Sequence, residues 1–151
     1  MCDLEKLFID NLGEPVVYKG QAVCGDFRIP VRTGQVFRVT FVESSSKFGQ
    51  GISIDTNGQF VLHNARPDAD QGCSKIILWE KTAPKITEWV AEKGDWIEVW
   101  NAWDTGDGVI DSGHRNAGML HSEEDGVHVF RCSDGPGDVD FGNLVFTVEV
   151  L

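Results

Sequence analysis

Oxygen-bearing side chains are concentrated in one short loop near the C-terminus. The segment 134–143 carries three carboxylates and one carboxamide, and an apolar, strand-like run at 144–150 follows it directly. Gly-Pro-Gly at 135–137 excludes a helix there. Carboxylate and amide oxygens on such a loop are the ligands that Ca²⁺ prefers in proteins. The loop therefore predicts a calcium site formed by Asp134, Asp138, Asp140 and Asn143.

A second acidic loop follows the tryptophan-rich part of the chain. Asp104 and Asp107 lie in a Gly-containing segment, and Asp111 ends it. Loops from different hairpins of a β-sandwich meet at the same end, so the two acidic loops are expected to share one rim. Together with backbone carbonyls and water, the oxygens of the two loops fall within the range of 6–8 ligands that calcium takes. The sequence pattern of an EF-hand calcium loop is absent. The full set of expected metal ligands is Asp104, Asp107, Asp134, Asp138, Asp140 and Asn143.

All five tryptophans fall between positions 79 and 103. A β-sandwich of this size buries aromatic side chains readily, so the core is one interpretation. The other is that one or two indole rings are exposed and stack on sugar rings or cations. Trp103 leads into the second acidic loop, and Trp100 lies one pleat before it. The residues expected to line a ligand site are Trp103, Trp100, His114 and Asn116.

The elements that must position these residues are short strands separated by turns. Apolar spacing favours a short amphipathic helix over 4–12, with a strand over 6–10 as the competing interpretation. Turn signals occur at Thr33-Gly34, Asn57-Gly58, 93–95 and Asp125-Gly126. Regular strands without intervening helices indicate an all-β, antiparallel β-sandwich, jelly-roll or galactose-binding-like, forming a single domain over 1–151. The expected strands are 15–23, 26–31, 35–42, 51–55, 59–62, 75–80, 85–91, 96–102, 117–122, 126–132 and 143–151.

Charge is distributed unevenly along the chain. The formal net charge is −11, and residues 95–151 hold 12 of the 24 Asp and Glu but only two of the 13 Lys and Arg. This sign argues against binding to nucleic acid and favours bound cations or a basic protein partner. The chain shows no apolar run long enough for a bilayer and no signal peptide, so we expect a cytoplasmic protein unless a signal was removed. The oligomeric state is left open.

The four cysteines are Cys2, Cys24, Cys73 and Cys132, and none forms a C-x-x-C pair. A structural zinc site is therefore not expected, and reduced thiols are the favoured state. A Cys24–Cys73 or Cys73–Cys132 disulfide is the alternative if the protein is exported.

Catalytic patterns are weak throughout the chain. His121 and His128 flank Asp125-Gly126 and are expected to face each other, which with a carboxylate suggests a transition-metal site. Ser112 with His114, or Cys132 with His128, lacks a recognised nucleophile motif. Paired carboxylates suit glycoside hydrolysis, but none stands out. A binding protein is favoured over an enzyme.

The C-terminal loop also resembles a known sequence signature. The segment 134–146, DGPGDVDFGNLVF, is similar to the D-x-DFNDLVF signature of a β-sandwich domain family of bacterial secreted and surface proteins, in which acidic residues hold calcium. The resemblance implies metal ligation by Asp134, Asp138 and Asp140, with Asn143 at a position usually held by Asp and Gly142 at one held by Asn. More distantly, the loop resembles small bacterial calcium-dependent galactose-binding lectins.

Three functions follow as expectations. The first is a calcium-supported, lectin-like module with carbohydrate as its ligand. The second is an acidic protein-binding module, such as an immunity protein or inhibitor of a basic toxin. The third is a small β-sandwich enzyme of unassigned chemistry.

Overall fold

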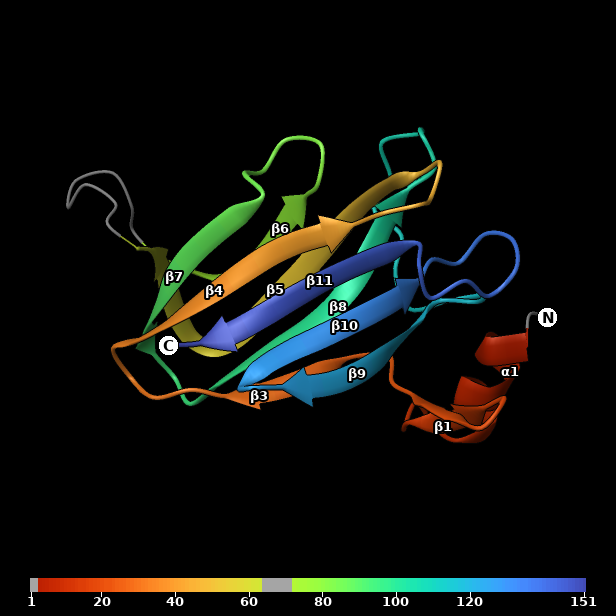
Figure 1. Ribbon diagram of the computed structural model, residues 1–151, viewed down its shortest axis with the longest axis horizontal. Helices are drawn as coiled ribbons and strands as arrows, with labels where there is room; N and C mark the ends of the chain where they lie inside the picture. The colour runs from red at the N-terminus through yellow and green to blue at the C-terminus, as the bar shows by residue number, and fades with distance from the viewer. Residues whose placement is uncertain (1–2, 64–71) are drawn as a thin grey trace.

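Antiparallel strands build almost the whole molecule. The computed structural model describes residues 3–63 and 72–151, in which one short helix precedes eleven strands (Figure 1). The all-β, sandwich-like fold and the short N-terminal helix expected from the sequence are confirmed. In the described part of the chain, no helix is long and apolar enough to cross a membrane.

The helix and the strands have the following bounds in chain order. They are α1 (Asp3–Asp10), β1 (Val16–Tyr18), β2 (Gln21–Val23), β3 (Phe27–Pro30), β4 (Gln35–Glu43), β5 (Gly49–Leu62), β6 (Cys73–Trp79), β7 (Ile86–Lys93), β8 (Trp96–Asp104), β9 (Gly118–Glu124), β10 (Val127–Ser133) and β11 (Leu144–Val150).

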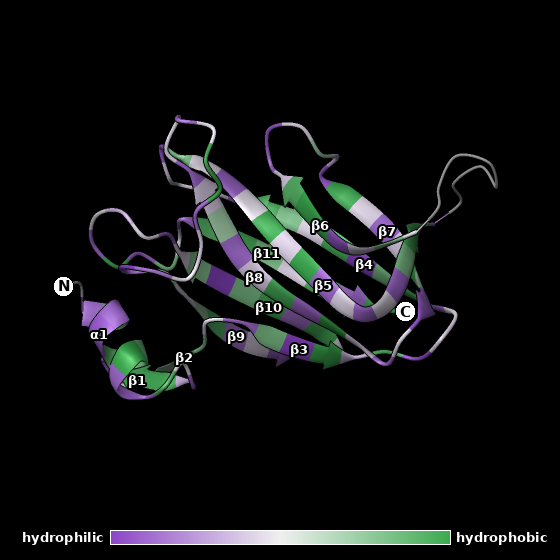
Figure 2. Ribbon diagram, turned by 180° about the vertical axis from the view of Figure 1, so that it is seen from behind, coloured by the Kyte–Doolittle hydropathy of each residue, from purple (hydrophilic) through white to green (hydrophobic). Residues whose placement is uncertain are grey.

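One nine-stranded sheet folds over on itself to form two layers. Its strand order is β3-β8-β5-β7-β4-β11-β10-β9, and β6 pairs with β5. The first part of β5 pairs with β6 and β8, whereas its last residues pair with β7. Strand β5 therefore belongs to both layers. Figure 1 looks onto the layer β7-β4-β11-β10-β9, and Figure 2 shows the layer β6-β5-β8-β3 from behind.

The prediction of two strands separated by an Asn57-Gly58 turn was wrong, because β5 continues through this dipeptide and bends there. The side-chain amide of Asn57 donates to Oδ1 of Asp95, and Asn57 Oδ1 accepts from the backbone N–H of Asp95 at 3.0 Å. A Cβ atom at position 58 would lie 2.1 Å from the carbonyl oxygen of Lys93. The dipeptide thus fastens the bend to the β7–β8 turn instead of reversing the chain.

A second boundary also differs from the sequence-based expectation. The single strand expected over 15–23 is a two-stranded hairpin, β1 paired with β2. Its turn residues Lys19 and Gly20 have φ of 49° and 81°. Two consecutive positive φ values define the tight hairpin turn whose twist matches that of the flanking strands.

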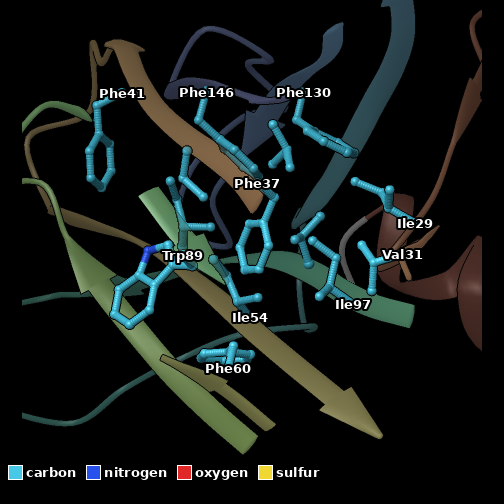
Figure 3. Packing of buried hydrophobic residues seen from close by; sticks show 14 of the residues in the cluster. Ile29, Val31, Phe37, Phe41, Ile54, Phe60, Trp89, Ile97, Phe130 and Phe146 are labelled. Atoms are coloured by element: carbon cyan, nitrogen blue, oxygen red, sulfur yellow. The ribbon is translucent and has the colours of Figure 1, made fainter. Parts of the chain in front are cut away.

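The core lies between the two layers. On β4, Phe37, Val39 and Phe41 alternate inward, as a strand with one buried face requires. They meet Ile54 and Phe60 from β5, and Figure 3 shows the aromatic rings interleaved with branched aliphatic side chains. Phe37 and Phe60 pack edge to face, with ring centroids 6.0 Å apart. Burial of these side chains supplies the main driving force for folding.

The two layers approach each other again at their outer edges, β3 and β9. The ring of Phe27 on β3 stacks on His121 of β9, with centroids 3.8 Å apart. A ring nitrogen of His121 lies 2.9 Å from one of His128, so one imidazole donates and the other accepts. Just before β3, Cys24 forms an isolated β-bridge with Met119. The expectation that His121 and His128 face each other is confirmed, and the pair closes the seam of the sandwich.

We expect this seam to make stability depend on pH. Burial, and then the charge of His128, lower the pKa of His121 below its ordinary value of 6.5, and Glu123 partly offsets this shift. The stabilisation is therefore fully present above about pH 6.5 and is lost as the pH falls through the folded-state pKa. Thermal unfolding between about pH 7 and 5 should show a falling midpoint that His121→Phe, which keeps a ring on Phe27, flattens.

His63→Gln is the matched control, because His63 lies outside the seam and has a backbone hydrogen bond to Glu88. Its unfolding midpoint should follow the unmodified protein across the same pH range. An unchanged slope in the His121→Phe variant would contradict a role for the seam.

Candidate functional site

Asp134 is the most buried carboxylate of the predicted calcium loop. Only 2% of the residue is exposed, and its Oδ2 atom accepts hydrogen bonds from Ser46 Oγ and from Gln50 Nε2, the latter at 3.0 Å. Ser46 belongs to the β4–β5 connection and Gln50 to β5. The carboxylate thus joins the β10–β11 loop to the neighbouring strand connection through hydrogen bonds.

The remaining oxygens of this loop also serve its backbone. Asn143 Oδ1 accepts from the N–H of Asp134 at 3.1 Å, and Asp140 Oδ1 accepts from the N–H of Gly142 at 2.8 Å. Asp138 is exposed. Asp134, Asp138, Asp140 and Asn143 do line one open hollow of about 330 Å³.

Calcium needs its ligand oxygens to surround one point, whereas hydrogen bonds already engage Asp134, Asp140 and Asn143. In residues 3–63 and 72–151, no group of three or more His, Cys, Asp or Glu side chains lies close enough to hold a metal ion. As folded, the loop residues do not fit a calcium ion without rearrangement. Calcium binding therefore stays a prediction.

The second acidic loop lies at the same end of the molecule but faces a different hollow. Asp104 Oδ1 accepts from the N–H groups of Gly106 at 2.8 Å and Gly108 at 3.3 Å, and Asp107 Oδ1 accepts from Val109 at 3.0 Å. Figure 1 shows both loops at the end opposite the C-terminus. The two acidic loops were correctly predicted to lie at the same end of the sandwich. Their carboxylates, however, line two different cavities.

Trp103 is fully buried and offers no face to a ligand. Its ring lies beneath the C-terminal loop, where a Cβ atom at position 135 would come within 2.4 Å of Cζ2. The ring of His114 packs against it with a centroid distance of 5.1 Å. The expected ligand-binding role of Trp103 is therefore corrected to one of support for the loop.

Asn116 likewise supports the loop and does not face a cavity. Its Nδ2 donates to the carbonyl of Gly137 at 2.8 Å, and its Oδ1 accepts from the N–H of Leu4 at 3.4 Å. Both side-chain groups are thus engaged, and the residue is 9% exposed. His114 stays partly exposed, with Nε2 3.4 Å from Asp111 Oδ1.

The outward face of the layer β6-β5-β8-β3 carries three of the tryptophans. Side chains alternate along β8, so Trp96, Glu98 and Trp100 face outward, while Ile97 and Val99 are buried. Trp100, one of the tryptophans expected to line a ligand site, is half-buried on this face and also packs against the core.

The third outward tryptophan, Trp79 on β6, was not singled out by the sequence analysis. It pairs directly with Gly51 on β5, and a Cβ atom at position 51 would lie 2.9 Å from Cε3 of its ring. The six-membered ring therefore occupies the space that a side chain on β5 would fill. A glycine inside a strand marks such a close approach, and this was the signal available in the sequence.

Trp79 lines a cavity of about 250 Å³ on this face. The other lining residues are Gly49, Gln50, Lys81, Thr82, Asp104 and Gly106. The cavity therefore combines an indole ring with a carboxylate, an ammonium group and a hydroxyl group. A larger open hollow of about 610 Å³ near the C-terminus has no Phe, Tyr or Trp among its lining residues.

Gln50 connects this cavity to the C-terminal loop. The residue is 2% exposed, and its Nε2 donates to Asp134 Oδ2 and to the carbonyl of Phe48. Its Oε1 is buried and has no hydrogen-bond partner in the described part of the chain. Gln50 is next to Gly51 in β5, so its side chain points to the buried face of the sheet, away from the ring of Trp79.

The nucleophile arrangements considered from the sequence gain no support. Burial raises the pKa of the fully buried Cys132 thiol well above its ordinary value, which disfavours the reactive thiolate. Burial, followed by the charge of Asp26, raises the pKa of Cys24 to about 11. Both thiols are free, so neither forms a disulfide, and Cys73 Sγ contacts the carbonyl of Phe60 at 3.8 Å. Cys2 lies outside the described residues.

Asp26 and Glu98 line one hollow, and the pKa of Glu98 is raised above its ordinary value. Burial contributes most to raising the pKa of Glu98, followed by the hydrogen bond and charge of Asp26, while Arg28 partly offsets the shift. Glycoside hydrolysis by a retaining mechanism needs carboxyl groups about 5–5.5 Å apart, and an inverting mechanism needs more. A hydrogen-bonded pair is closer than either.

The acidic side chains of the last third do not share one surface. The turn at 123–126 joins β9 to β10 at one end of the strands, whereas the loop 134–143 follows β10 at the other end (Figure 1). Binding to a basic protein partner therefore stays a prediction, and the net charge of the chain is the observation that supports it.

We expect Asp134→Ala to destabilise the protein, because it leaves the donors of Ser46 and Gln50 without their buried acceptor. The loss should be about 1–3 kcal/mol in the free energy of unfolding, measured by urea denaturation. The exposed Asp138→Ala, in the same loop, should stay within about 0.5 kcal/mol of the unmodified protein. Equal effects of the two substitutions would contradict the structural role of Asp134.

Comparisons of the chain with protein-family models, with curated proteins and with solved structures found no match. The function of the chain is therefore inferred from its own residues, above all from the outward sheet face that bears Trp79 and Trp100.

Proposed function

We propose that the chain is a lectin-like, carbohydrate-binding module whose ligand binds in the Trp79 cavity. The observation that carries the proposal is the position of Trp79 over Gly51, which fixes an indole ring on an outward sheet face inside a cavity. Pyranose rings present C–H groups on one face, and these stack on aromatic rings. A rigid strand keeps the ring in place before the ligand arrives.

The polar lining of the cavity complements the hydroxyl groups of a sugar. Asp104 accepts hydrogen bonds, Lys81 donates them, and Thr82 does both. Few polar groups around an apolar surface are typical of small-ligand sites. A cavity of about 250 Å³ has room for a single sugar ring and not for a protein segment.

We expect Trp79→Ala to weaken sugar binding at least tenfold, because the stacking surface is lost. This corresponds to about 1.4 kcal/mol or more, within the range for an aromatic contact together with its buried area. A panel of neutral oligosaccharides identifies a binding sugar, and isothermal titration calorimetry then measures its Kd for both proteins.

Trp96→Ala is the matched control on the same face. The guanidinium of Arg28 lies 3.8 Å from the Trp96 ring centroid and covers it, so this ring is not available for stacking. Its removal should leave the Kd unchanged. The proposal fails if no sugar of the panel binds, or if Trp79→Ala binds as tightly as the unmodified protein.

Calcium support is the second part of the proposal. The shared hollow of Asp134, Asp138, Asp140 and Asn143, together with the resemblance of this loop, favours it. Ligation would require Asp138 and Asp140 to turn toward Asp134, where Ser46 and Gln50 both donate to the same carboxylate oxygen, Oδ2. Any calcium that binds the folded state alone raises its melting temperature.

The expected result is a rise in the melting temperature with millimolar calcium that is lost in an Asp138→Asn, Asp140→Asn double variant. Asp107→Asn, in the other acidic loop, is the control and should keep the rise. Titration of sugar with and without calcium then separates the two parts of the proposal, since a sugar that binds equally in both conditions retains the lectin-like function without the metal.

A further inference from the structure

A second cavity lies on the same sheet face, beside the Trp79 cavity. It has a volume of about 380 Å³, and its side-chain lining comes from Trp100, Asp26, Glu98 and Ser112, with glycines at its margin. The two charged residues among them are both acidic. An aromatic ring flanked by carboxylates in a hollow is the arrangement that proteins use to bind ammonium groups.

The register of the strands places the two cavities next to each other. Trp79 pairs with Gly51, and Gly51 pairs with Ala102 on β8, two residues from Trp100 along the same face. Strands lie about 4.8 Å apart and rise about 3.4 Å per residue, so Trp79 and Trp100 are separated by roughly 12 Å between their Cα atoms. One extended ligand can therefore contact both tryptophans.

Acidic groups outnumber basic groups around the second cavity. Asp55 on β5 lies directly across from Glu98 on β8 and from Lys75 on β6. Its Oδ1 is buried without a hydrogen-bond partner among the described residues. Arg28 Nη2 lies 3.7 Å from Glu98, while its guanidinium covers Trp96. With Asp26 included, three carboxylates face two cationic side chains.

The ring of Trp100 already receives one ammonium group from the protein itself. Lys75 Nζ lies 5.7 Å from the ring centroid, within the distance at which the π-system attracts a cation. Lys75 is an exposed residue at the edge strand β6, so its side chain can leave the ring when another cation binds. Asp26 and Glu98 line the same cavity as Trp100, so a cation bound there would be hydrogen-bonded by both carboxylates.

We propose that the Trp100 cavity is a second subsite of the saccharide site, and that Asp26 and Glu98 select a chain bearing a protonated amine, that is, an amino sugar. This inference rests on the proposed carbohydrate-binding function and names its ligand class. The first sugar ring lies on Trp79, and a following ring presents its amine between Trp100 and the carboxyl pair.

The test compares two trimers that share ring and linkage but differ in charge, glucosamine trimer and N-acetylglucosamine trimer. Calorimetry is carried out at a pH at which the free amines are protonated. We expect the glucosamine trimer to bind about tenfold more tightly than the acetylated trimer and also more tightly than glucosamine monomer, because only it reaches the carboxyl pair with a cation.

An Asp26→Asn, Glu98→Gln double variant should bind both trimers with the affinity of the acetylated one. Glu124→Gln, Asp125→Asn removes the same number of charges from the exposed turn between β9 and β10 and should keep the preference for the amine. This control separates the local carboxyl pair from general attraction of a cation to an acidic protein. Circular dichroism verifies that each variant is folded.

The inference is overturned if the two trimers bind equally, if neither binds, or if the preference survives in the Asp26→Asn, Glu98→Gln variant. The proposed carbohydrate-binding function is tested separately, by whether Trp79→Ala weakens the binding of a neutral sugar. One outcome separates the two proposals. If Trp79→Ala weakens sugar binding but Asp26→Asn, Glu98→Gln keeps the preference for the glucosamine trimer, the lectin-like function stands and only the second subsite is removed.

Discussion

The bend in β5 is the constraint on which the rest of the structure depends. One strand belongs to both layers, and the paired hydrogen bonds of Asn57 with Asp95 hold it at the point where it changes partners. Without this bend, the nine strands would form one open sheet with two exposed faces. With it, Phe37 and Phe60 meet inside the core, while the other face of the layer β6-β5-β8-β3 is turned toward solvent.

The far end of the molecule is held by polar contacts as well as by apolar packing, in which Val139 and Phe141 of the C-terminal loop contact a cluster that contains Leu4. Asp134 ties the C-terminal loop to Ser46 and Gln50, and Asn116 ties it to the N-terminal helix. Because buried polar groups are favourable only when they are satisfied, each of these residues fixes its partners as well as itself. The residues that looked most like metal ligands are thereby the ones that shape the rim beside the Trp79 cavity.

Much of the fold was predictable from the sequence, because period-two alternation and turn residues report on local structure. The strands from β6 to β11 lie within a few residues of their expected positions. The prediction of a turn at Asn57-Gly58 was wrong because this dipeptide usually forms hairpin turns through its local backbone geometry. Here Asn57 instead bonds to Asp95, which is nearly 40 residues away in the sequence. Local patterns carry no information on such a partner.

The candidate site was only partly predictable. Trp103 was favoured for its place beside an acidic loop, although continued alternation from Ile97 and Val99 puts it on the core side of β8. Trp100 was assigned correctly to the outward face. Trp79 could not be ranked above the other tryptophans without knowing that it faces Gly51, since strand pairing is a long-range property.

The pairing of Gly51 with Trp79 has a consequence for how this surface changes by mutation. The position of the indole ring is determined by the absence of a side chain on the neighbouring strand. Nearly every single substitution at position 51 enlarges the residue and displaces the ring, even though the glycine itself need not touch a ligand. A mutational scan that scores ligand capture would therefore mark a residue with no functional group of its own as one of the least replaceable positions on the surface.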